Sequence, residues 1–87
     1  MPYFVYIIQS LKDKKYYIGS TSNVEARLQF HNNGLQRSTK TRIPFVLIYT
    51  EKLESKKFAL TRERQIKSFK GGDAFKKLIF SGCGPAS

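Results

Sequence analysis

Two aromatic, β-branched segments separated by six residues constrain the fold more than any other feature of the chain. The first is "YFVYIIQ" at positions 3–9, and the second begins with "YYIGS" at positions 16–20. Between them, "SLKDKK" has the polar composition of a turn. Because so short a connection joins antiparallel neighbours, the sequence predicts a β-hairpin over residues 3–20.

The segment after the hairpin predicts a helix with defined ends. Ser22 and Glu25 match a capping box, in which two side chains bond free backbone N–H groups at a helix start. The helical pattern continues through "NVEARLQFHNN", and Gly34 then supplies the left-handed residue that ends a helix. Residues 35–44, "LQRSTKTRIP", predict a basic loop.

Three further elements complete the predicted order β-β-α-β-α-α. The near-continuous apolar run "FVLIYTE" at 45–51 predicts a strand buried on both faces, which we expect to be the central one. Ser55 precedes a helical segment over 56–70, and Asp73 precedes a shorter one over 74–80. We therefore expect an α+β fold, a three-stranded sheet flanked by helices.

Size and charge limit the organisation and the partners. The 87 residues predict a single domain over 1–80 and a flexible tail over 81–87 that contains the lone Cys83. Lysine and arginine number 16 against 6 acidic residues, a net charge of +10. This imbalance indicates nucleic acid as the partner, with an anionic membrane surface as the rival. Since no apolar run spans a bilayer and no signal-peptide pattern is present, we expect a cytoplasmic protein.

Two polar residues of the first predicted helix lie toward its apolar side. At about 100° per residue, Val24, Leu28 and His31 form one stripe, and Arg27 lies beside it. Arg27 and His31 are also an i, i+4 pair and project side by side. An arginine stem on the core rim and a histidine near the helix C-terminus explain the pattern structurally, and a shared polar site is the alternative.

Glu63 raises the same question with the opposite charge. It lies one turn after Ala59 and one turn before Ile66, close to their apolar stripe. A carboxylate there is costly unless it is paired, for example with Arg27, or holds a metal ion. Lys70, two turns further on, either reaches a phosphate or lies near a helix C-terminus for dipole reasons.

Tyrosines are concentrated on the predicted hairpin. At a period of two, Tyr17 shares one strand face with Gly19, and Tyr16 shares the other with Ile18. Cross-strand aromatic pairs stabilise hairpins, which is a structural explanation for any one of these tyrosines. The hairpin tyrosines of interest are Tyr3, Tyr6, Tyr16 and Tyr17.

Together these features resemble the GIY-YIG nuclease domain family. The first half-motif is "FVY" at 4–6, and the second is intact as "YIG" at 17–19. The chain is most similar to small stand-alone bacterial members related to the excision-repair nuclease subunit, through "YYIGST", "RLQFHNNG", "STKTRIP" and "ALTRERQIK". The resemblance covers about residues 2–80 and implies an antiparallel order for the three strands.

The resemblance also implies a metal-dependent DNA endonuclease. Glu63 would be the ligand of one divalent ion, Mg²⁺ or Mn²⁺. Tyr17 would be the general base with Tyr6 supporting it, which requires nearby positive charge because the pKa of tyrosine is ~10. Arg27 would hold the scissile phosphate, and His31 would bond the phosphate or Tyr17. In this interpretation Gly19 lets the strand turn so that these residues converge.

Further basic residues are expected to bind the DNA backbone: Arg37, Lys40, Arg42 and Lys70. Two departures from the family pattern stand out. Phe4 replaces the first glycine of the name, and the late asparagine of several family enzymes has no counterpart, with Lys70 in its neighbourhood.

The small size leaves little room for a sequence-reading module. We therefore expect a structure-selective or single-strand-preferring enzyme in DNA repair or processing, whose affinity depends on phosphates and salt. The alternative is a non-catalytic nucleic-acid-binding module with the same fold. A membrane-surface protein ranks last, because the sequence has no basic amphipathic helix with a large apolar face.

Overall fold

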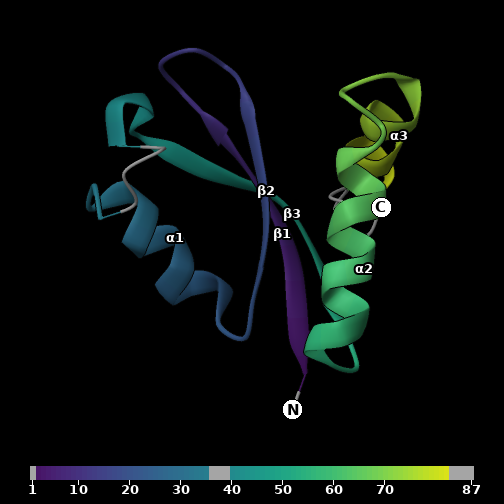
Figure 1. Cartoon of the computed structure of the whole chain (residues 1–87). Helices are drawn as coiled ribbons and strands as arrows, with labels where there is room; N and C mark the ends of the chain where they lie inside the picture. Colours follow the sequence, from purple (N-terminus) through teal and green to yellow (C-terminus); the bar gives the residue numbers. More distant parts are fainter. Residues whose placement is uncertain (1, 36–39, 83–87) are drawn as a thin grey trace.

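The computed structural model describes residues 2–35 and 40–82, and the order of its elements confirms the predicted β-β-α-β-α-α. Figure 1 shows the sheet between α1 on one side and α2 with α3 on the other. In chain order the elements are β1 (Tyr3–Ser10), β2 (Tyr16–Thr21), α1 (Val24–Asn32), the 3₁₀ turn η1 (Lys40–Arg42), β3 (Phe45–Leu53), α2 (Lys56–Lys67) and α3 (Asp73–Gly82).

The strands form one antiparallel sheet in the order β2-β1-β3. The predicted hairpin is confirmed, but the prediction that the third strand is central and doubly buried is wrong. β1 is central and β3 is an edge strand. The apolar run misled because an edge strand has a neighbour on one side only, and both Val46 and Leu47 are exposed. A register shift between Ile7 and Ile8 breaks the alternation of faces, so Phe45 and Tyr49 pack on opposite sides of the sheet.

Alternation of side chains along β1 divides the core into two layers. Val5 and Ile7 face α2 and α3, where they pack with Tyr49, Ala59, Ile66, Phe75 and Ile79. Tyr6 and Ile8 face the opposite way, toward α1, and pack with Phe45, Tyr17, Val24, Leu28 and Ile43. Each face of the sheet is therefore covered by its own helical layer.

Helix α1 is capped by Asn23, so the predicted capping box of Ser22 and Glu25 is wrong. The Asn23 side chain accepts a hydrogen bond from the N–H of Ala26 at 3.0 Å. The Thr21 hydroxyl accepts one from the N–H of Asn23 at 3.1 Å and fixes the entry to the helix. Asparagine and serine are similarly good caps, so tertiary geometry decides between neighbours.

The C-terminal end of α1 is joined to the third strand. Gly34 has φ +75° and ends the helix as predicted. The side-chain amide of Asn32 accepts a hydrogen bond from the N–H of Phe45 at 2.7 Å and donates one to its carbonyl at 3.1 Å. These two bonds satisfy the backbone N–H and carbonyl of Phe45 and fix the position of the helix over the sheet.

The two C-terminal helices differ slightly from their predicted bounds. Ser55 occupies the N-cap position of α2 without a side-chain capping bond, and the helix ends at Lys67 rather than at residue 70. Helix α3 includes residues 81 and 82, which were predicted to belong to the tail. The rest of that tail, with Cys83, lies outside the described residues. Within residues 2–35 and 40–82, no helix is long and apolar enough to cross a membrane.

Gly19 leaves space for the side chain of Tyr6. The expectation that Gly19 lets the strand turn is wrong. Gly19 lies inside β2, directly opposite Tyr6 on β1. A Cβ atom at Gly19 would lie 2.5 Å from the Tyr6 hydroxyl oxygen and 2.7 Å from Cζ. The phenol ring of Tyr6 therefore lies across the Gly19 backbone, which only a residue without a side chain allows.

We predict that Gly19→Ala lowers the free energy of unfolding by about 1–3 kcal/mol, because the added methyl group overlaps Tyr6. Urea denaturation followed by circular dichroism measures this change. Ser20→Ala at the neighbouring position is the control and should remain within about 0.5 kcal/mol of wild type. An unfolding midpoint of Gly19→Ala equal to or above that of wild type would contradict the close contact.

Candidate active site

A buried hydrogen bond between Tyr6 and His31 lies at the base of the site. Tyr6 Oη and His31 Nε2 are 3.0 Å apart, and the two residues are only 1% and 0% exposed. Tyr6 comes from the central strand and His31 from the last turn of α1, so the bond joins the helix to the sheet. The imidazole also contacts the ring of Tyr17 edge-on, with 4.8 Å between centroids.

Burial keeps both partners of this bond neutral near pH 7. Loss of hydration raises the pKa of Tyr6 above its ordinary 10.0, and the hydrogen bonding and charge of Arg27 offset part of that rise. Burial, followed by the positive charge of Arg27, lowers the pKa of His31 below 6.5. A protonated phenol and a neutral imidazole therefore face each other.

Arg27 lies beside this pair with one donor left unsatisfied. Its guanidinium carbon is 4.6 Å from the centroid of the Phe30 ring, a cation–π contact that positions the side chain. Its Nε atom is buried and has no hydrogen-bond partner among the described residues. A buried unpaired donor costs stability, and an anion such as a phosphate would satisfy it.

Glu63 approaches from α2. Ala59 and Ile66, on its two sides along the stripe, are fully buried, and its own side chain is 16% exposed, as the stripe predicted. Its ion pair is with Lys67 on the next turn, with 2.7 Å between Oε2 and Nζ, instead of the pairing with Arg27 considered from the sequence. The charge of Glu63 contributes to raising the pKa of Tyr6, so the two groups are within electrostatic range.

The carboxylate of Glu63 suits a hard cation that keeps most of its water. Among the described residues there is no group of three or more His, Cys, Asp or Glu side chains that would hold a metal. This argues against a centre built from several protein ligands in that part of the chain. Mg²⁺ requires less, because it binds through one or two carboxylates together with substrate phosphates.

The residues expected to bind the DNA backbone occupy several different settings. Arg42 Nε is 3.1 Å from Asp13 Oδ2, so its guanidinium already has an acidic partner. Lys40 is exposed next to it, whereas Arg37 lies outside the described residues. Lys70 is exposed beyond the end of α2, with φ +52°. Among the described residues of this set, Arg42 is therefore already paired, and Lys40 and Lys70 are exposed cations on different parts of the fold.

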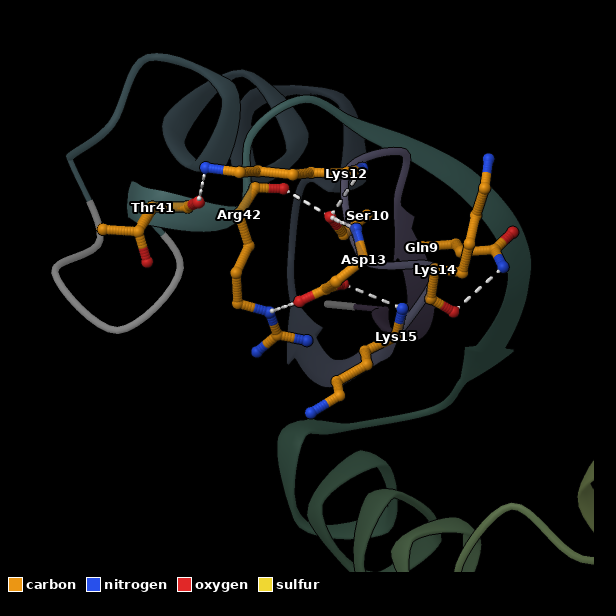
Figure 2. A network of polar contacts seen from close by, with 8 residues as sticks. All are labelled: Gln9, Ser10, Lys12, Asp13, Lys14, Lys15, Thr41 and Arg42. Atoms are coloured by element: carbon orange, nitrogen blue, oxygen red, sulfur yellow. Dashed lines mark hydrogen bonds and ion pairs between the residues drawn. The ribbon is translucent and has the colours of Figure 1, made fainter.

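A polar network connects the hairpin loop to the region of Arg42 (Figure 2). The buried Ser10 hydroxyl donates to the Arg42 carbonyl at 2.6 Å and accepts from the N–H groups of Lys12 and Asp13. The Lys12 ammonium donates to the Thr41 carbonyl at 3.2 Å. The hairpin loop was expected to be only a turn, but its lysines add positive charge next to Arg42. The segment "KDKK" at 12–15 already indicated this charge through Lys12, Lys14 and Lys15.

The fold and these side chains define the class of the protein, a small nuclease-type domain. Two tyrosines, an arginine and a carboxylate come from four elements around a three-stranded sheet: β1, β2, α1 and α2. Residues 2–76 match the GIY-YIG catalytic domain family. The chain belongs to this family, whose members form a superfamily of nucleases.

Relatives of similar size support the assignment. A UPF0213 protein of Staphylococcus haemolyticus is 48% identical over 68 residues, which are 77% of this chain and 82% of the relative. Another, from Clostridium perfringens, is 43% identical over 65 residues, 74% of this chain and 69% of the relative. The solution NMR structure of a UPF0213 protein from Bacillus halodurans has a TM-score of 0.56 and 32% identity, covering 99% of this chain and 90% of that chain.

We predict that the stability of the protein falls as the pH is lowered below about 6.5. The folded state holds the pKa of His31 below this value, so the unfolded chain binds the proton first. The stabilisation is therefore complete above pH 6.5 and is lost as the pH falls toward the pKa of the folded state. His31→Gln should flatten the slope of unfolding free energy against pH by up to about 1.4 kcal/mol per unit.

Urea unfolding at several values between about pH 5 and pH 8 measures the two slopes. Because His31 is the chain's single histidine, NMR titration of the imidazole signals gives its pKa without a variant. Equal slopes in wild type and His31→Gln, or an imidazole pKa above 6.5, would contradict the buried neutral histidine.

Proposed function

We propose that this protein is a metal-dependent DNA endonuclease that hydrolyses phosphodiester bonds, with Tyr6, Tyr17, Arg27, His31 and Glu63 as its active-site residues. The observation that carries the proposal is the buried, unpaired Nε of Arg27 beside the Tyr6–His31 bond. A guanidinium that contacts the Phe30 ring, and whose Nε has no hydrogen-bond partner among the described residues, suits a phosphate oxygen.

The proposed roles follow from position and protonation. Arg27 would bind the scissile phosphate and offset the negative charge of the transition state. Tyr17, which is partly exposed, would take the proton of the attacking water, aided by the charge of Arg27. Tyr6 stays protonated because its pKa is raised, so it supports the site without acting as the base. His31 has no exposed surface, so it would position Tyr6 and Tyr17 and not contact the phosphate.

Glu63 would hold the divalent ion. When bound, Mg²⁺ or Mn²⁺ would supply Lewis acidity to the phosphate and to the water that attacks it. The small exposure of Glu63, 16%, supports this role, because its ion-pair partner Lys67 is 55% exposed and offsets only part of the cost of burying the carboxylate.

The substrate proposal rests on charge and size. A net charge of +10 on 87 residues supports binding to phosphates, with affinity that falls steeply as salt increases. A domain this small has little surface for reading sequence, so we favour single-stranded or branched DNA, as in DNA repair or processing. Four basic residues would bind the DNA backbone: Arg37, Lys40, Lys70 and Arg42, the last of which already has Asp13 as an ion-pair partner.

We predict that the protein cleaves end-labelled DNA with Mg²⁺ or Mn²⁺ and not with chelator. Glu63→Gln, Tyr17→Phe and Arg27→Met should each lower the cleavage rate by about 100-fold or more, because each removes a group that acts on the reacting atoms. The assay compares single-stranded, duplex and branched substrates of equal length, with binding measured in parallel by fluorescence anisotropy.

Two matched controls separate chemistry from folding. Tyr3→Phe makes the same change at a hairpin tyrosine outside the site, and Glu54→Gln removes an exposed carboxylate before α2. Both should keep the wild-type rate. If wild type binds every substrate and cuts none with either metal, the proposal fails and the protein is a non-catalytic nucleic-acid-binding module.

A further inference from the structure

Lys67 forms an ion pair with Glu63, the carboxylate that would bind the metal at the proposed site. Its ammonium is 2.7 Å from Glu63 Oε2, the side chain of Lys67 is 55% exposed, and that of Glu63 is 16% exposed. The carboxylate is thus held in place, while the lysine head group is able to leave through solvent. An ammonium and a divalent cation cannot share one oxygen at contact distance without strong repulsion.

Lys67 also lines a cavity in which its ammonium group could bind an anion. This cavity, of about 250 Å³, lies between β2 and the end of α2, and none of the described residues that line it is acidic. Lys70 lines the same cavity and makes no ion pair with any described residue. Tyr16 lines it as well, with its ring edge-on to Phe75 at 5.0 Å between centroids.

The lining of this cavity matches one nucleotide of a DNA strand. Two lysines, in a lining whose described residues include no carboxylate, attract a phosphate, and an exposed tyrosine ring provides a face on which a base stacks. Since Lys67 lines the cavity and also contacts Glu63, it lies between the candidate nucleotide site and the proposed metal site.

We propose that Lys67 exchanges partners when DNA binds. In the free protein it neutralises Glu63, and in the complex its ammonium moves to a DNA phosphate over the cavity and leaves Glu63 to the divalent ion. The inference rests on the proposed function, because it takes Glu63 as the metal ligand. DNA and metal then bind cooperatively, and each increases the affinity for the other by the same factor.

The ordinary explanation of the pair is helix stabilisation by oppositely charged residues at i and i+4. The two explanations differ in metal affinity. Under the exchange, Lys67→Met removes the competing cation, so the full-length protein should bind Mn²⁺ about five-fold more tightly in the absence of DNA. Electron paramagnetic resonance of free Mn²⁺ measures this affinity without any cleavage.

Lys56→Met is the matched control. It removes the same charge from the first turn of the same helix but not from the Glu63 carboxylate, so it tests whether the loss of net charge alone is sufficient. Its Mn²⁺ affinity should equal that of wild type. Glu63→Gln identifies the ligand and should weaken Mn²⁺ binding.

The coupling to DNA provides a second readout. In a Tyr17→Phe background, proposed to leave DNA uncut, a single-stranded oligonucleotide should tighten Mn²⁺ binding by about 5- to 150-fold. Adding Lys67→Met should reduce this factor by about five-fold, because the competitor is already absent from the free protein.

The outcomes separate the two proposals. Equal Mn²⁺ affinities of Lys67→Met and Lys56→Met, with Glu63→Gln still weakened, would overturn the exchange and leave Glu63 as the metal ligand. Unchanged Mn²⁺ binding by Glu63→Gln would overturn the proposed metal site itself, and the exchange with it.

Discussion

The candidate site depends on the buried hydrogen bond between Tyr6 and His31. The bond forms because Gly19 has no side chain and so leaves space for the phenol ring of Tyr6 to cross β2. Asn32, the next residue after His31, fastens the end of α1 to the backbone of Phe45. The position of His31 is therefore fixed from both sides. Arg27, one turn earlier on the same helix, is held where its Nε is buried and has no partner in the part of the chain that the structure describes.

The site also requires both layers of the fold. Tyr6, Tyr17, Arg27 and His31 belong to the layer between the sheet and α1, whereas Glu63 comes from α2 on the opposite side of the sheet (Figure 1). Burial is the main cause that raises the pKa of Tyr6, and the charge of Glu63 is a smaller one that acts in the same direction. β2 is an edge strand, so a substrate can approach the site along it without displacing another strand.

Much of this arrangement could be predicted from local patterns. The hairpin, the stripe of Val24, Leu28 and His31, and the place of Glu63 between two buried residues follow from strand and helix periods. The position of β3 could not be predicted, because an apolar run does not reveal how many strands will flank it. The Asn23 cap and the steric role of Gly19 depend on contacts across the sheet, and choosing Lys67 over Arg27 as the partner of Glu63 requires their distances.

The central claim is that Glu63 holds a divalent ion beside the tyrosines. Paramagnetic broadening by Mn²⁺ tests it most directly, in the ¹H–¹⁵N spectrum of Tyr17→Phe protein bound to a short single-stranded oligonucleotide. If Glu63 holds the ion, the strongest loss of signal will be in the turn of α2 that contains Glu63 and in the adjoining strand β2, and both will recover in Glu63→Gln. Broadening centred on Glu54 or Asp73, or a pattern that Glu63→Gln leaves unchanged, would contradict it.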